Sequence, residues 1–261
     1  MVIMSLALKK FDLSTVPKHF VMLAIGRRRS GKTTAILSLM KAFKNRYDFA
    51  VVFCGSLATC EEYQRVVPPS FVHKEWDVKL VESMVARQER KRESKQKVED
   101  ILLVMDDLAF NPSIFKSKVM KRLFYNGRHV HIGLVFTLQY IMDLDTSFRT
   151  NVDVCICLRE QIQANRERYY KYFFGQFPTQ RAFNMALDAC TENYGALVTA
   201  NNLTISNEIN QSVFWMRAPR EVPDSRLGNP MLWAMDEQAY EDTEFKEDQT
   251  GKTVRRVEPV P

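Results

Sequence analysis

A short segment rich in glycine and arginine carries the most specific chemical pattern in this 261-residue sequence. Residues 26–33 read Gly-Arg-Arg-Arg-Ser-Gly-Lys-Thr and fit the pattern G-x-x-x-x-G-K-[S/T] without deviation. In such a loop the backbone N–H groups at the start of the next helix point at phosphate, and the helix dipole adds to the attraction. The segment therefore predicts a site for a nucleoside triphosphate.

The residue types of this loop fit that chemistry. Gly26 and Gly31 allow backbone angles and a close approach that a Cβ atom would block. We expect Lys32 to place its ammonium between the β- and γ-phosphates, and Thr33 to offer its hydroxyl to Mg²⁺. The α-phosphate would be bound by Thr34. The predicted nucleotide-binding set is Gly26, Arg27, Arg28, Arg29, Ser30, Gly31, Lys32, Thr33 and Thr34.

The three consecutive arginines allow two interpretations. They are either exposed loop residues that attract phosphate nonspecifically, or one of them contacts the γ-phosphate, or DNA, in a neighbouring subunit.

Two adjacent carboxylates form the second candidate group. Asp106 and Asp107 directly follow the apolar run Ile101–Met105. This position is typical of a Walker B segment, in which the first acid holds Mg²⁺ through water and the second orients the attacking water. Two acids at a strand end could instead cap the next helix or lie in solvent. Together with the phosphate loop, they favour ATP hydrolysis over phosphate transfer to another acceptor.

A third group follows the apolar run Ile132–Thr137. This strand would deliver Thr137 and Gln139 to the edge of the sheet where Asp106 emerges. A polar side chain there can sense the γ-phosphate, and we interpret Gln139 as such a sensor. The alternative is an ordinary polar residue at a strand end.

The elements that must position these groups alternate along the chain. The apolar runs are nearly continuous, as expected for strands covered on both faces, and helix-period stretches lie between them. Strand–helix–strand alternation predicts an α/β fold with a mostly parallel sheet and right-handed crossovers. The predicted strands are Val21–Ile25, Phe49–Cys54, Ile101–Met105, Ile132–Thr137 and Val152–Leu158, and the predicted helices are Lys32–Asn45, Val78–Lys97, Ser113–Tyr125, Gln161–Phe173 and Thr179–Thr191.

The pattern changes towards the C-terminus. Gly195–Thr199 and Ser212–Met216 are expected to form an antiparallel hairpin. From residue 217 onward proline recurs and charges dominate, which is typical of a flexible tail. We therefore divide the chain into a P-loop ATPase domain over residues 1–216 and a tail over residues 217–261.

Composition limits the classes of protein that fit. The chain is 46% hydrophobic and 26% charged with a formal net charge of +6, which excludes wholesale disorder and suits a polyanionic partner without demanding one. No apolar run approaches the roughly 18–20 residues of a membrane helix, and the first 13 residues are a poor secretory signal.

Five cysteines without a C-x-x-C pattern indicate a reduced intracellular protein. No Cys/His spacing predicts a zinc site, so we expect structural roles for His73, His129 and His131.

Two further clusters carry weaker signals. Arg87, Lys91 and Lys95 recur every four residues and would share one face of a helix, which is either solvated or in contact with the DNA backbone. An aromatic cluster is expected to lie in the core or at a subunit interface; it comprises Tyr169, Tyr170, Tyr172, Phe173 and Phe174.

Read together, these motifs resemble the FtsK–HerA superfamily of DNA-pumping ATPases. The segments GRRRSGKTT, ILLVMDD, GRHVHIGLVFTLQY and SFRTNVDVCI are most similar to the genome-packaging ATPase of nucleocytoplasmic large DNA viruses, the poxvirus type. The later NYGALVTANN and VFWMRAP segments resemble that family's terminal hairpin, so the similarity runs from about Val21 to Pro219. The GRH…Q strand and the F-R-T-N-V-D turn are its selective part.

The resemblance implies a RecA-like (ASCE) core with additional strands, assembled as a pentameric or hexameric ring around double-stranded DNA. It assigns Mg²⁺ and ATP to Lys32 and Thr33, and the acidic pair to Asp106 and Asp107. Gln139 would be the sensor in this assignment. An arginine finger would reach the γ-phosphate of a neighbouring subunit; Arg128 is the first candidate and Arg149 the second, although either could be a surface residue or an ion-pair partner. The departure from the superfamily pattern is aspartate, rather than glutamate, at position 107.

The predicted function is therefore an ATP-driven translocase that packages viral double-stranded DNA into a capsid. Its expected partners are DNA, other copies of the chain, and capsid or packaging-vertex proteins, at the virus assembly site in the host cytoplasm or in the virion. Two alternatives stay open at this point. A P-loop phosphotransferase would yield ADP together with a phosphorylated small molecule, and a nucleotide-gated assembly scaffold would bind ATP with negligible turnover.

Overall fold

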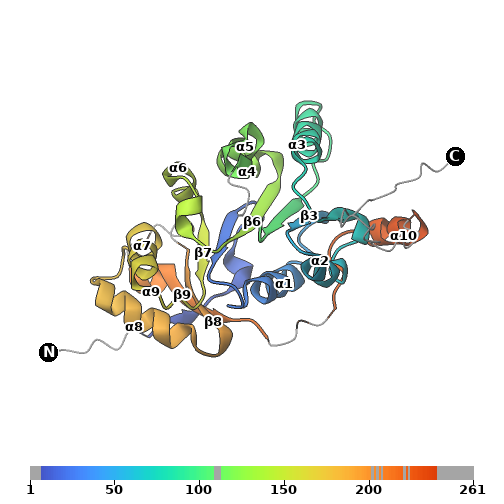
Figure 1. Cartoon of the computed structure of the whole chain (residues 1–261). Coiled ribbons are helices and arrows are strands. Elements are labelled where there is room, and N and C mark those ends of the chain that lie inside the picture. Colours follow the sequence, from blue (N-terminus) through green and yellow to red (C-terminus); the bar gives the residue numbers. More distant parts are fainter. Residues whose placement is uncertain are drawn as a thin grey trace.

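A mixed nine-stranded sheet forms the centre of the molecule in the computed structural model (Figure 1), which describes residues 7–108, 113–200, 203, 206, 208–219, 222 and 224–239. The strand order is β1-β9-β8-β7-β2-β6-β5-β3-β4. Every pairing is parallel except those of β8 with β7 and β9. The prediction of a mostly parallel sheet with a C-terminal antiparallel element is confirmed.

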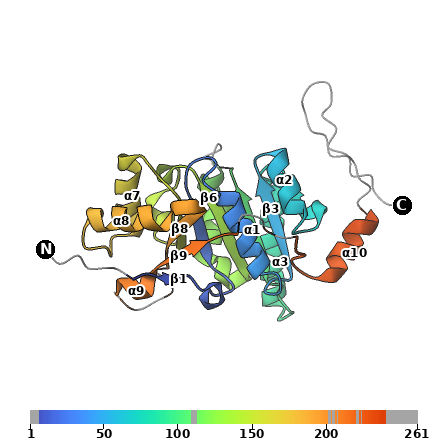
Figure 2. The ribbon, with the colours of Figure 1, turned by 90° about the horizontal axis from the view of Figure 1, so that it is seen from below.

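Five central strands match the expected apolar runs and are buried along almost their whole length. They are β2 (Val21–Ile25), β3 (Phe49–Cys54), β5 (Ile101–Asp106), β6 (Ile132–Leu138) and β7 (Val154–Cys157). The strands β8 (Gly195–Thr199) and β9 (Val213–Arg217) extend the sheet on one side. Two short strands, β1 (Lys9–Lys10) and β4 (Val72–His73), border it, and Figure 2 shows β1 beside β9.

Helices cover both faces of the sheet, and alternate strand residues feed two separate cores. In β2, Leu23 and Ile25 pack towards one face, whereas Met22 and Ala24 pack towards the other. The second face is covered by α1 (Lys32–Ala42) and α2 (Leu57–Gln64). The first is covered by α3 (Val78–Glu93), α4 (Ser113–Lys116), α5 (Lys118–Asn126), α6 (Thr146–Arg149), α7 (Gln163–Phe173) and α8 (Gln180–Cys190) (Figure 1).

This topology explains where chemistry can occur. The strands β2, β6 and β5 are parallel neighbours, so their carboxyl ends meet at one edge of the sheet. Ligands of open α/β sheets bind outside that edge. The loop after β2, the acids at the end of β5 and the polar residues at the end of β6 are therefore brought together.

Several helices differ from the sequence prediction for local reasons. The stretch Ser113–Tyr125 forms two helices because Ser117 caps the second one, its Oγ accepting from Met120 N. Helix α3 ends at Glu93, and Lys95 adopts a left-handed conformation (φ 55°) beyond it. The prediction that Lys95 shares a helix face with the residues before it is therefore wrong.

The aromatic cluster of α7 belongs to the core, as one of the two interpretations predicted. Tyr169, Phe173 and Phe174 are buried, and Tyr170 and Tyr172 pack against the same core.

Two of the five cysteines are paired. Cys54 and Cys60 form a disulfide with their Cα atoms 5.9 Å apart. The expectation that all five thiols are reduced is thus not met, because α2, which the sequence analysis did not predict, places Cys60 over the end of β3.

The segment after β9 contributes to the packing. Helix α10 (Pro230–Ala239) lies within the stretch assigned to the tail, and the last part of that tail, residues 240–261, lies outside the described residues. Trp233 is 6% exposed, and its Nε1 donates to the Leu227 carbonyl (3.1 Å). The buried carboxylate of Asp236 accepts from the backbone N of Ser70 (3.1 Å). No helix of the described residues combines the length and apolar character needed to cross a membrane.

We expect Trp233→Ala to lower the free energy of unfolding by about 3 kcal/mol, because it leaves a cavity between α10 and the core. Met231→Ala is the matched control, since Met231 lies on the same helix and is 66% exposed. Urea denaturation of both variants measures the difference. Equal midpoints for the two variants would show that α10 adds nothing to the stability of the fold.

Candidate nucleotide-binding site

The loop between β2 and α1 has the backbone that the sequence pattern predicts. Gly31 is left-handed (φ 95°) and is the N-cap of α1, a conformation that glycine adopts without strain. At Gly26 an added Cβ would lie 2.7 Å from Ser30 Oγ and 3.0 Å from Leu158 Cβ, so a larger residue would displace the loop. The N-terminus of α1 therefore opens directly into the loop.

Lys32 lies folded over this loop and is only 8% exposed. Its ammonium donates to the carbonyl oxygens of Gly26 (2.8 Å) and Arg27 (3.1 Å). Burial lowers the pKa of Lys32, and attraction by Asp106 and Asp107 opposes that shift. The carbonyl partners of this buried ammonium are neutral. A polyphosphate would stabilise the ammonium more strongly, because its oxygens carry full negative charge.

Asp106 is the most thoroughly bonded acid of the site. Its carboxylate is 1% exposed and accepts three hydroxyl hydrogen bonds from three different elements. The donors are Thr33 of α1 (2.8 Å), Thr137 of β6 (2.9 Å) and Tyr63 of α2 (3.0 Å). Because a buried carboxylate without donors is costly, these hydroxyls hold Asp106 in one orientation.

Tyr63 is a site residue that the sequence analysis missed. Its side chain is buried, and burial raises its pKa well above the ordinary value, so it remains a hydroxyl donor to Asp106. Ser56, whose Oγ accepts from Thr59 N at the start of α2, is the sequence signal that could have located this helix.

Asp107 and Gln139 form a second, directly connected pair. The backbone N of Asp107 donates to Thr137 Oγ1 (2.8 Å), and Gln139 Nε2 donates to Asp107 Oδ1 (2.6 Å). Asp107 has a left-handed backbone (φ 55°), which turns the chain sharply after β5. The residue interpreted as a sensor is therefore bonded to the residue interpreted as the water-orienting acid.

These groups line one pocket of about 900 Å³, a size suited to a nucleotide. Of the predicted loop set, Arg28, Arg29, Gly31, Lys32, Thr33 and Thr34 line it. Arg27 instead borders a smaller cavity of about 350 Å³ together with Arg28, Gln139 and Asn165. The hydroxyl of Ser30 is buried and has no hydrogen-bond partner within the described part of the chain.

Part of the pocket lining comes from residues next to β8 and at the end of β9, which the sequence analysis did not include in the site. Asn193, Tyr194 and Arg217 line it. Tyr194 is 68% exposed and left-handed (φ 60°), and a Cβ on Gly31 would lie 3.5 Å from its Cδ1. An exposed aromatic ring thus lies beside the end of the phosphate loop.

The two arginine-finger candidates lie outside this pocket. Arg128 is exposed on the 3-10 turn η3 (Gly127–Val130), at the end of β6 opposite to Gln139. Arg149 is 7% exposed, donates to the Leu144 carbonyl (2.8 Å) and stacks over the Tyr172 ring (4.3 Å). These contacts hold the Arg149 guanidinium inside its own subunit and favour the ion-pair or packing alternative for this residue.

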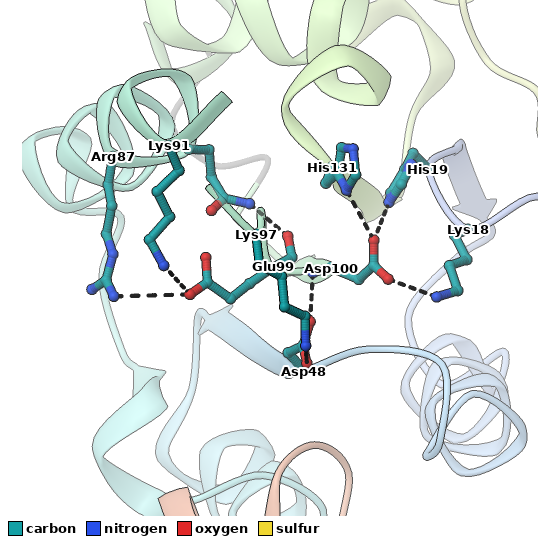
Figure 3. A network of polar contacts seen from close by, with 10 residues as sticks. Lys18, His19, Asp48, Arg87, Lys91, Lys97, Glu99, Asp100 and His131 are labelled. Atoms are coloured by element: carbon teal, nitrogen blue, oxygen red, sulfur yellow. Dashed lines mark hydrogen bonds and ion pairs between the residues drawn. The ribbon is translucent and has the colours of Figure 1, made fainter. Parts of the chain in front are cut away.

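The basic face of α3 is engaged within the chain (Figure 3). Lys91 forms an ion pair with Glu99, and Arg87 lies 4.0 Å from the same carboxylate. For these two residues, the pairing with Glu99 favours a solvated helix face over a face in contact with the DNA backbone.

The oxygen donors around Asp106 fit a magnesium ion. Mg²⁺ prefers carboxylate and hydroxyl oxygens, and Thr33 Oγ1 already lies 2.8 Å from Asp106 Oδ2. Thr33 and Asp106 are therefore the residues that would hold the ion next to the phosphates.

Comparison with known proteins gives two kinds of similarity. The sequence profile of the family described as Poxvirus A32 protein matches residues 8–173. Uncharacterized protein 088R of Invertebrate iridescent virus 3 is 31% identical over 197 residues, which make up 76% of this chain and 75% of that protein.

Solved structures share the fold at low sequence identity. The genome packaging NTPase B204 from Sulfolobus turreted icosahedral virus 2, in complex with AMPPCP, superimposes with a TM-score of 0.56 at 13% identity, covering 78% of this chain and all of that one. EssC (ATPases 2 and 3) from Geobacillus thermodenitrificans gives a TM-score of 0.54 at 14% identity, covering 87% of this chain and 44% of that one. The predicted P-loop NTPase fold is confirmed.

We expect Tyr63→Phe to weaken Mg²⁺-dependent ATP binding at least about tenfold, because one hydrogen bond to a charged carboxylate is worth about 1.5–3 kcal/mol. Binding in the presence of EDTA should not change, since Tyr63 contacts the acid and not the phosphate loop. Titration with a fluorescent ATP analogue measures both affinities.

Tyr47→Phe is the matched control, because the Tyr47 hydroxyl is also buried but donates to the Lys18 carbonyl before β2. Equal Mg²⁺ dependence in wild type and Tyr63→Phe would remove Tyr63 from the site.

Proposed function

Because this chain belongs to the Poxvirus A32 protein family, we propose that it is an ATP-hydrolysing motor that moves double-stranded viral DNA into a capsid. The observation that carries the proposal is the convergence of a lysine, a threonine, two aspartates and a glutamine on one pocket. These residues are Lys32, Thr33, Asp106, Asp107 and Gln139. The family and the packaging NTPase B204 support the packaging role.

The positions of these groups in the pocket support the hydrolysis of a bound triphosphate. Lys32 would exchange its carbonyl partners for phosphate oxygens, and Thr33 and Asp106 would hold a magnesium ion, which when bound supplies positive charge next to the phosphates. A water attacks the γ-phosphorus, the bond from that atom to the β–γ bridging oxygen breaks, and ADP and phosphate form. Asp107 accepts a hydrogen bond from the attacking water and orients it.

Gln139 connects this reaction to the rest of the chain. In the structure its amide nitrogen holds Asp107. A γ-phosphate that draws the amide away would free Asp107 for water, so Gln139 would report nucleotide state to β6.

To move DNA, the chain must assemble as a ring and bind the DNA phosphates through positively charged side chains. The exposed arginines of the phosphate loop and Arg128 on η3 are free to meet DNA phosphates or a neighbouring subunit. We assign the trans finger to Arg128, since Arg149 is buried. Capsid or packaging-vertex proteins at the virus assembly site would bind the assembled ring.

We expect Asp107→Asn to reduce kcat at least about 100-fold while leaving ATP binding intact, because the amide orients water poorly. Lys32→Ala should lose both binding and turnover. Asp145→Asn is the matched control, since Asp145 is exposed and its side chain makes no cap hydrogen bond.

Steady-state release of free phosphate, measured with and without duplex DNA at several salt concentrations, tests the proposal. Full ATPase activity that ignores DNA at every salt concentration would contradict the motor, and ADP formation without free phosphate would indicate a phosphotransferase.

We also expect Tyr194 to stack on the nucleobase. Tyr194→Ala should raise the KM for ATP about fivefold or more, given about 1–3 kcal/mol for a stacked base, and Tyr194→Phe should behave like wild type. Inhibition by inorganic tripolyphosphate, which has no base, should be the same in all three proteins. An unchanged KM in Tyr194→Ala would exclude the stacking role.

A further inference from the structure

A second group of chemistry-bearing side chains lies at the opposite edge of the sheet (Figure 3). His19 comes two residues before β2, Asp100 directly before β5 and His131 directly before β6. These three strands are neighbours in the order β2-β6-β5, so their amino ends are adjacent. The proposed motor function uses none of these side chains.

The three side chains converge on one point. Asp100 Oδ1 lies 2.8 Å from His19 Nε2 and 3.2 Å from His131 Nδ1, and all three atoms lie within 4.8 Å of one another. Figure 3 shows both imidazole rings directed at the same carboxylate oxygen. Ligands bonded at about 2.0–2.2 Å to a tetrahedral zinc ion are roughly 3.3 Å apart; the 3.2 Å separation matches that spacing, and the 2.8 Å separation would have to widen by about half an ångström.

The contact of His131 with Asp100 is an ion pair when the imidazole is protonated. His131 Nδ1 is buried, lies 3.2 Å from the carboxylate oxygen and forms no hydrogen bond of good geometry with the described residues. An imidazole nitrogen next to a carboxylate is satisfied either by a proton on that nitrogen or by a cation bound between the two groups. The ring of His131 is nevertheless 41% exposed, which leaves access for an ion and for a water ligand.

The backbone around the group is held by hydrogen bonds that do not use the converging atoms. Ile101 N donates to the His131 carbonyl (2.9 Å), and Asp100 N donates to Asp48 Oδ2 (2.8 Å). The ammonium of Lys18 binds the other carboxylate oxygen of Asp100 (2.6 Å) and leaves Oδ1 facing the histidines. Outer partners of this kind orient the ligands of metal sites.

We propose that His19 Nε2, Asp100 Oδ1 and His131 Nδ1 bind a divalent transition-metal ion such as Zn²⁺, with water as the fourth ligand. Two imidazoles and one carboxylate suit zinc and its neighbours, whereas Mg²⁺ prefers oxygen ligands and belongs to the nucleotide pocket. The ion would join the chain before β2 to the starts of β5 and β6 and would stabilise the folded state.

The test uses the full chain in excess Mg²⁺, with Co²⁺ as a spectroscopic probe and Zn²⁺ in competition with a chromophoric chelator. We expect one ion per chain, visible absorption bands of low-symmetry cobalt, and a melting temperature that rises with Zn²⁺. His131→Asn should weaken binding at least about tenfold, and asparagine tolerates the left-handed backbone at this position (φ 57°). His129→Asn is the matched control, because His129 is exposed two residues away.

A second variant and a direct measurement keep the outcome decisive if His131→Asn folds poorly. His19→Ala should also lose binding, and X-ray absorption at the zinc edge of the wild-type protein should show imidazole ligands. Wild-type protein that binds no ion, or binding that survives both variants, would overturn the site. Neither result bears on the ATPase, so the two proposals fail independently.

Discussion

The burial of the Asp106 carboxylate is the constraint on which the nucleotide site depends. A carboxylate that is 1% exposed must be satisfied by donors, and here hydroxyls from α1, α2 and β6 meet at its two oxygens. Those three donors can converge only if β2, β6 and β5 lie in their observed order and α2 packs over the end of β3. One buried acid thus couples the position of the phosphate loop to the packing of the sheet.

Backbone strain is concentrated around the same pocket. Six non-glycine residues of the described chain have a positive φ, and four of them line the pocket: Arg29, Asp107, Asn193 and Tyr194. Such conformations persist where the surrounding structure holds them, and they gather at functional sites. The sharp turn at Asp107 lets its carboxylate meet Gln139 while Asp106, one residue earlier, remains buried in the hydroxyl network.

Strand β6 connects the two ends of the molecule. His131 precedes it and Gln139 follows it, so about 25 Å of extended chain separates the histidine–aspartate group from the nucleotide pocket. The two groups use different chemistry: oxygen and ammonium groups face the phosphates at one edge, and imidazoles face a carboxylate at the other. That contrast allows either site to be altered without touching the other.

The sequence by itself determined the local chemistry. The phosphate loop, the acidic pair and Gln139 could be recognised because each is a short pattern attached to a buried apolar strand, and five strands were located from their apolar runs. Tertiary structure alone decided which distant residues meet. Tyr63 at Asp106, Tyr194 beside the phosphate loop and the His19–Asp100–His131 group join positions that no local pattern connects. Arg149 is buried, which the sequence did not predict. Its burial depends on the order of the strands in the sheet, and hydrophobic periodicity does not encode that order.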